Sequence, residues 1–96
     1  METIIKELYD KGFESSTKAH KLVEGAYYMQ YEYSDFEMLE FTAYEKDAPI
    51  GKILVIDELS LTNYYTNEIY IKIDYDLVFK SVDEFLQLLK LLGYKI

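Results

Sequence analysis

Apolar and polar residues alternate along residues 68–80, and this alternation is the clearest structural signal in the chain. The odd positions from Ile69 to Phe79 are all apolar, whereas among the even positions only Val78 is plainly apolar. A period of two predicts a β-strand with one buried face and one exposed face. The segment is long for a single strand, so we expect a bend or a bulge near residues 74–76.

Three earlier segments also predict strands. Residues 26–33 are rich in tyrosine, which favours strands, and residues 36–45 continue the alternation, although their Glu, Met, Leu and Ala also suit a helix. A turn around Pro49 leads into residues 52–62. Within this third segment, residues 53–56 are apolar at every position, which predicts a central strand covered on both faces.

A C-terminal helix is predicted to begin at Ser81 and to end at Gly93. Ser81 and Glu84 have the spacing of a capping box, in which the serine accepts a hydrogen bond from the first turn and the glutamate reaches back. The apolar residues that follow form one broad arc at helical spacing, which predicts packing on a sheet. Leu91 falls outside this arc, and we expect it to be exposed.

The N-terminal part of the chain predicts one or two shorter helices. Residues 3–11 place their apolar side chains on one face, and Gly12 suits the end of that helix. Residues 17–24 also allow a helix, with Ser15 or Ser16 as its N-cap. The two segments form either a helical hairpin or one bent helix.

These elements predict a single α+β domain that spans residues 1–96. Short connections between successive strands favour an antiparallel meander. We therefore expect a four-stranded antiparallel sheet with one or two N-terminal helices and a C-terminal helix packed on one face. No apolar run approaches the ~20 residues that cross a bilayer, and the first residues do not resemble a signal peptide. The chain has no cysteine, which suits the cytoplasm.

The charge of the chain restricts its partners. It carries 18 acidic residues against 10 basic ones, all lysine, for a net charge of -8. Residues 24–47 hold seven acids and one lysine, and residues 57–76 hold five acids and one lysine, whereas both ends are near neutral. The absence of arginine is typical of a low-GC genome. Whatever its cause, an acidic chain without arginine is poorly suited to bind nucleic acid directly.

The residues give no pattern for catalysis or metal binding. His20 is the one histidine, and no cysteine can assist it as a nucleophile or as a zinc ligand. The carboxylates of Asp74 and Asp76 lack the glycine and the further oxygen ligands of a calcium loop. The four glycines are scattered, so there is no phosphate-binding loop. We therefore predict neither an enzyme nor a cofactor.

The tyrosines point instead to an interface. The chain has 11 tyrosines, and several fall with carboxylates on the outward face of the predicted sheet or in its loops. Tyrosine supplies contact area with few rotors, and acids favour fast association with a basic partner. The alternative is that these tyrosines flank a smaller second core or a homodimer contact. The candidate partner-binding residues are Tyr28, Glu32, Asp35, Glu37, Glu40, Tyr44, Asp57, Glu58, Tyr64, Tyr65, Glu68, Tyr70, Asp74 and Asp76.

In size, acidity and predicted plan the chain resembles phage-encoded inhibitors such as DNA-mimic anti-restriction proteins, anti-CRISPR proteins and uracil-DNA glycosylase inhibitors. This resemblance is one of class, without a shared motif, and it implies an inhibitor in the host cytoplasm that occludes the basic surface of a nuclease or another nucleic-acid-binding protein. One alternative is an immunity protein or antitoxin against a basic toxin. Another is a homodimeric assembly subunit that associates through the C-terminal helix and Leu91.

Overall fold

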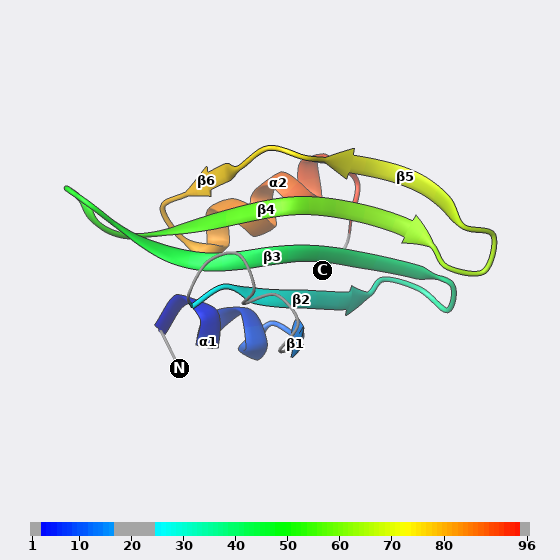
Figure 1. Cartoon of the computed structure of the whole chain (residues 1–96), viewed down its shortest axis with the longest axis horizontal. Helices are drawn as coiled ribbons and strands as arrows, with labels where there is room; N and C mark the ends of the chain where they lie inside the picture. Colours follow the sequence, from blue (N-terminus) through cyan, green and yellow to red (C-terminus); the bar gives the residue numbers. More distant parts are fainter. Residues whose placement is uncertain (1–2, 17–24, 95–96) are drawn as a thin grey trace.

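The chain folds as an α+β domain, shown by a computed structural model that describes residues 3–16 and 25–94 (Figure 1). The first and last helices and the four predicted strand segments appear in the predicted order, but residues 14–16 add a strand and residues 68–80 form two strands. In chain order they are α1 (Thr3–Asp10), β1 (Glu14–Ser16), β2 (Tyr27–Glu32), β3 (Glu37–Ala48), β4 (Gly51–Asn63), β5 (Glu68–Ile73), β6 (Leu77–Phe79) and α2 (Val82–Leu91).

The sheet is an antiparallel meander, as predicted, but it is wider than four strands. Strands β1 to β5 lie in sequence order, and β6 pairs with β4 beyond the end of β5. Strand β4 is therefore central, with β3 on one side and both β5 and β6 on the other. Its apolar run is buried on both faces, because Leu54 and Ile56 belong to the core while Val55, on the opposite face, is only 2% exposed.

The additional strand is β1, which the residue pattern did not predict. Glu14 pairs with Gln30 and Ser16 pairs with Tyr28, so β1 extends the sheet beyond β2. A strand of three residues is too short to show a period of two, and its sequence is polar. The helix predicted for residues 17–24 lies outside the described residues.

The long alternating segment is bent, as predicted, and it forms two strands. Ile71 and Ile73 in β5, like Leu77 and Phe79 in β6, pack against the core. The prediction that every odd position is buried is wrong for Ile69 and Tyr75, which are 59% and 68% exposed. A register shift opposite residues 69–71 interrupts the alternation, and Tyr75 lies in the bend between the two strands.

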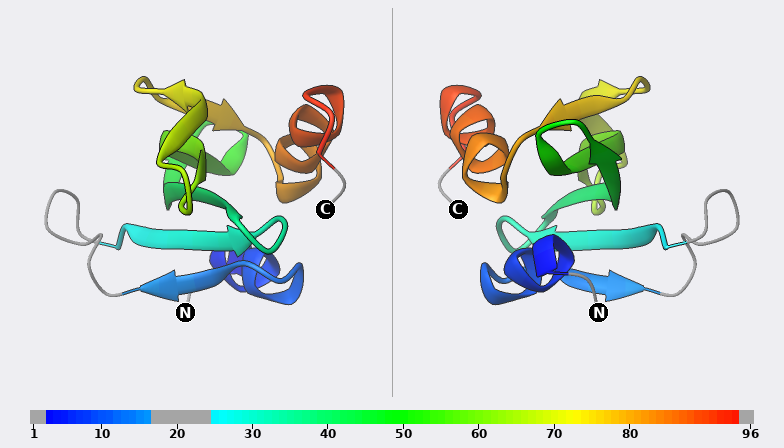
Figure 2. Two further views of the ribbon diagram at one scale, coloured as in Figure 1. Left: turned by 90° about the vertical axis from the view of Figure 1, so that its right-hand side faces the viewer. Right: turned by 90° about the vertical axis from the view of Figure 1, so that its left-hand side faces the viewer.

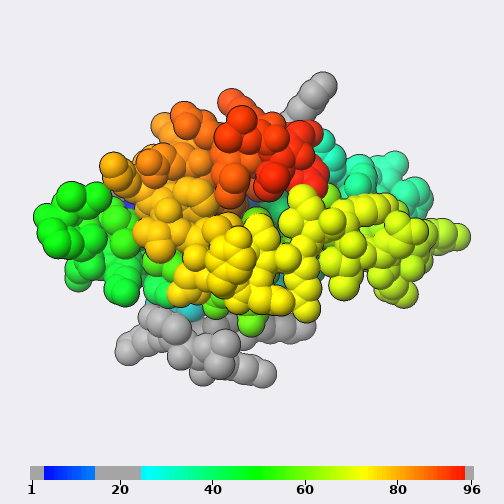
Figure 3. Space-filling view, turned by 90° about the horizontal axis from the view of Figure 1, so that it is seen from above, coloured from blue at the N-terminus to red at the C-terminus, as the bar shows by residue number. Residues whose placement is uncertain are grey.

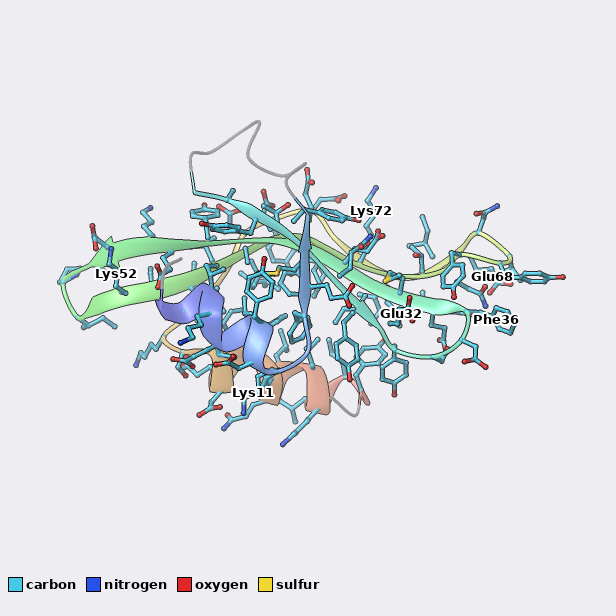
Figure 4. The ribbon with its side chains drawn as sticks, turned by 90° about the horizontal axis from the view of Figure 1, so that it is seen from below. Lys11, Glu32, Phe36, Lys52, Glu68 and Lys72 are labelled. Atoms are coloured by element: carbon cyan, nitrogen blue, oxygen red, sulfur yellow. The ribbon has the colours of Figure 1, made fainter. Side chains whose placement is uncertain are left out.

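Both helices cover the same face of the sheet, as Figure 4 shows. The end views in Figure 2 show that the sheet is twisted, so that α1 lies beside β1 and β2 while α2 lies beside β6. The core between the helices and the sheet contains a cluster of aromatic rings. The Phe85 ring of α2 lies 5.1 Å from Phe41, 5.3 Å from Phe79 and 6.1 Å from Phe13. Phe85 itself is fully buried and closes the core from the C-terminal side.

The helix ends are held by specific hydrogen bonds. In α2 the Ser81 hydroxyl accepts from the Glu84 N–H at 3.3 Å, as predicted, and the Glu84 carboxylate reaches back to accept from the Lys80 N–H at 2.6 Å. In α1 the N–H of Ile4 donates to the Glu45 carboxylate of β3 at 2.9 Å. Glu45 thus satisfies one of the free N–H groups in the first turn of a helix far away in sequence.

The exposed side of α2 also matches the prediction from the sequence. Leu91 is 85% exposed, as predicted from its position outside the apolar arc. Gly93, just beyond the helix, has a φ of +96°, a conformation that favours glycine. Within the described residues, neither helix has the length and apolar character needed to cross a membrane.

Candidate functional site

The sheet face away from the helices carries a group of carboxylates and tyrosines. Strand register places Tyr28 beside Thr42 and Thr42 beside Asp57, so these three side chains share one row across the sheet. In the next row Glu40 lies beside Ser60, and Ser60 lies beside Lys72. We define the acidic face as the predicted residues gathered here: Tyr28, Glu40, Tyr44, Asp57, Glu58, Asp74 and Asp76.

A β-bulge in β4 presents two of these acids next to each other. Between Glu40 and Thr42 the register advances by one extra residue on β4, and Glu58 takes a φ of +53°. The Glu58 N–H donates to the Asp57 carboxylate at 2.9 Å. Without the extra residue, strict alternation after Asp57 would turn Glu58 inward and Leu59 outward. With it, Leu59 is 1% exposed and Glu58 stays in solvent.

Strands β3 and β4 and the bend between β5 and β6 bring ionisable groups together beside this bulge. Partial burial and the neighbouring Asp76 carboxylate raise the pKa of Asp57, and Asp74 contributes further. Burial, followed by the charges of Asp76 and Asp57, raises the pKa of Tyr44. Both shifts have the sign expected where negative charges lie close together. The bend between β5 and β6 therefore packs its acids against the middle of β3 and β4.

A second part of the acidic face surrounds Glu40. Burial and the hydrogen bond to the Glu40 carboxylate raise the pKa of Tyr28 to about 12. Gln30 donates its amide to the same carboxylate at 3.4 Å. Tyr28 and Glu40 line a shallow hollow of about 310 Å³ together with Glu58, Ser60, Lys72 and Asp74.

Lys72 is a cation within this acidic surface. Its Nζ lies 3.9 Å from the Asp74 carboxylate, and its side chain is 59% exposed. Figure 4 shows Lys72 on the side of the sheet away from the helices. Among the described residues the acidic face still holds five carboxylates beside the Lys72 ammonium group, and an exposed pair at this distance contributes little to stability.

Six other predicted residues lie at one end of the sheet, where the β2–β3 and β4–β5 connections meet (Figure 1). They are Asp35, Glu37, Tyr64, Tyr65, Glu68 and Tyr70. Phe36 and Ile69 are exposed at the same end, at 52% and 59%, and neither was among the predicted contact residues. The sequence signal for each was only a large apolar residue that directly follows two polar ones. Glu32 belongs to neither group and lies beside Met38 along β2 and β3.

The acidic face offers a partner hydrogen-bond acceptors, aromatic contact area and negative charge. Among residues 3–16 and 25–94, no three acidic, histidine or cysteine side chains are placed to hold one metal ion. Glu40, Glu58 and Asp74 line the shallow hollow, where their carboxylates can accept hydrogen bonds from several cationic side chains at once.

No protein-family model, curated protein or solved structure matches this chain.

Proposed function

We propose that this protein is a small inhibitor whose acidic face occupies the basic, nucleic-acid-binding surface of a partner protein. The observation that carries the proposal is the convergence of five carboxylates from three elements onto the side of the sheet away from the helices. Carboxylates in such an array can stand where phosphates would otherwise lie, and the inhibitor then acts by occlusion.

The raised pKa of Asp57 supports this proposal physically. A raised carboxyl pKa means that the ionised form is disfavoured in the folded protein. The causes of the raised pKa are partial burial and, second, the charge of Asp76. Lysine or arginine side chains that approach Asp57 and Asp76 offset the repulsion between these two carboxylates, and this contributes part of the binding free energy. Acidic clusters also accelerate association with basic proteins in a salt-dependent way.

The tyrosines of the acidic face support the same role. Tyr28 and Tyr44 are half-buried among carboxylates, and their phenol groups are neutral at pH 7, with pKa values raised further above the ordinary 10.0. Neutral phenols donate hydrogen bonds and contribute apolar contact area, which carboxylates alone do not provide. The surface thus combines long-range attraction with short-range contacts.

The test begins with capture of partners from lysate of the native host on the immobilised protein, followed by mass spectrometry. The captured protein is then titrated against two triple variants of equal net charge. Glu40→Gln, Asp57→Asn and Asp76→Asn neutralise the acidic face, whereas a control variant with Glu7→Gln, Asp10→Asn and Asp83→Asn neutralises three acids of the helices.

We expect the acidic-face variant to bind roughly 10- to 100-fold more weakly at 150 mM salt, because each exposed charge pair contributes about 0.5–1 kcal/mol. The control variant should change affinity less than about threefold, and wild-type affinity should fall steeply with salt. Equal losses in both variants, or binding that does not depend on salt, would reject the proposal.

A further inference from the structure

Exposed aromatic and apolar side chains gather at one end of the molecule. They lie on the β2–β3 and β4–β5 connections and at the start of β5, which Figure 3 shows side by side in teal and yellow-green. We define the aromatic tip by its five residues, which are 46–76% exposed: Phe36, Tyr64, Tyr65, Ile69 and Tyr70. A patch of this kind on a small protein is typical of a contact surface.

The two connections that form the aromatic tip are joined to each other. The Phe36 ring lies 5.3 Å from the Tyr65 ring and 6.5 Å from the Tyr64 ring. The Tyr64 N–H donates to the Phe36 carbonyl at 2.9 Å, and the Tyr64 hydroxyl donates to the Asp35 carbonyl. The rings are thus held by backbone contacts across the two connections.

Asn63 fixes the remaining part of the aromatic tip. Its side-chain oxygen accepts from the N–H groups of Tyr65 and Thr66, both at 3.0 Å, and its side-chain nitrogen donates to the Tyr70 hydroxyl at 3.2 Å. One side chain therefore orders the turn and orients a neighbouring ring. A surface ordered before binding loses less conformational entropy when a partner arrives.

The charge around the aromatic tip indicates what it can bind. Asp35, Glu37 and Glu68 surround it, and residues 25–45 and 53–71 contain no lysine. Figure 4 shows Phe36 and Glu68 at one end of the molecule and Lys52 at the other. Aromatic faces and carboxylates both attract cations, and guanidinium groups stack on aromatic rings more readily than ammonium groups do. The same acids disfavour phosphate-bearing surfaces such as anionic lipid.

We propose that the aromatic tip binds an arginine-containing segment of a protein, as a second contact beside the acidic face. The identity of that protein as the inhibited partner rests on the proposed function, whereas the preference for arginine rests on the tip alone. A guanidinium group stacks on the exposed face of Phe36 or Tyr65 and pairs with the surrounding carboxylates. The stacking part of this contact depends less on salt than the ion pairs of the acidic face do.

The test titrates the protein with a hexa-arginine peptide and, separately, with a hexa-lysine peptide. Binding is monitored through the amide chemical shifts of the protein in NMR spectra at 150 and 500 mM salt. In the wild-type protein, we expect hexa-arginine to shift the amides of the aromatic tip at both salt concentrations and hexa-lysine to shift them less. Phe36→Ala with Tyr65→Ala should weaken hexa-arginine binding at the tip about 5- to 30-fold. Ile50→Ala, an exposed apolar residue of the opposite hairpin, serves as the control and should change nothing.

The outcomes separate this inference from the proposed function. A folded Phe36→Ala and Tyr65→Ala variant that binds like wild type would overturn the arginine site, whatever happens at the acidic face. The triple variant of the acidic face should keep the shifts at the tip, and their loss would also overturn a separate site. Shifts at the tip that depend on protein concentration without peptide would assign it to a second copy of the chain and reject the inference. The proposed function fails separately, if the acidic-face and helix variants bind the captured partner alike.

Discussion

The two faces of the sheet differ in almost every physical property. The face under α1 and α2 carries fully buried aliphatic and aromatic side chains, and among the described residues no charged side chain is buried. The opposite face carries half-exposed tyrosines and carboxylates, and there burial, followed by the neighbouring Asp76 charge, raises the pKa of Asp57. The comparison indicates that the first face provides most of the stability of the fold, whereas the opposite face includes at least one carboxylate whose ionised form lowers it. A surface that lowers stability needs another reason to exist, and binding is such a reason.

The largest effect should follow from removing a ring under the helices. Phe85→Ala removes a fully buried side chain that contacts three other rings, so we expect the free energy of unfolding to fall by about 3–5 kcal/mol. Urea denaturation measures this change. On the opposite face, Val78→Ala at a 61% exposed position should cost less than about 1 kcal/mol. Similar losses in both variants would contradict the assignment of stability to one face.

Glu45 is an exception to the separation of apolar and acidic side chains between the two faces, and substitutions of it test what this carboxylate contributes. It is a half-buried carboxylate on the side of the helices, where it accepts from the Ile4 N–H at 2.9 Å. Glu45→Ala should lower the free energy of unfolding by about 1 kcal/mol, as for the loss of a helix N-cap. Glu45→Gln keeps an acceptor and should cost less. If both variants lose the same stability in thermal denaturation, the negative charge matters rather than the hydrogen bond.

The smallest effect concerns the repulsion on the acidic face. Asp57→Asn should raise the free energy of unfolding at pH 7 by roughly 0.5 kcal/mol, because it removes an ionised group beside Asp76. The pKa of Asp57 is raised in the folded protein, so its ionised carboxylate lowers the free energy of unfolding by the full amount at any pH above that raised pKa. This loss of stability shrinks as the pH falls through the raised pKa and disappears below the ordinary value of 3.8. The advantage of the variant should therefore vanish in acid.

Asp47→Asn provides the matched control for that prediction. Asp47 lies at the β3–β4 hairpin and pairs with the Lys52 ammonium group at 2.9 Å. The same chemical change should leave stability unchanged or slightly lower there. A gain of equal size at both positions would mean that the net charge of -8, rather than local crowding, limits stability.

Local periodicity predicted most of the fold because each long strand and α2 carries its own pattern. The bulge at Asp57 and Glu58 was not predicted, although the apolar residues Leu54, Ile56 and Leu59, which the structure buries, are spaced by two and then by three. Strand β1 was not predictable, because three polar residues become a strand only by pairing with β2. Long-range pairing of this kind leaves no trace in a short window of sequence.

The candidate site shows the same limit. Alternation predicted that Tyr28, Glu40 and Tyr44 share a face, and the register confirms it. It could not show that Asp76 approaches Asp57, because that contact depends on how the chain bends between β5 and β6. The hydrogen bond from Ile4 to Glu45 crosses 41 positions of sequence, and no periodic pattern encodes it.

The order of the strands has a consequence for synthesis of the protein. From β1 to β5 each strand pairs with the one made just before it, and β6 returns to β4. The sheet can therefore assemble from its N-terminal end as the chain leaves the ribosome. Part of its apolar face, however, stays uncovered until α2, which is translated after all the strands, brings Phe85 into place. An unfinished chain that lacks α2 exposes the apolar surface that this helix covers and is the form most in need of chaperones.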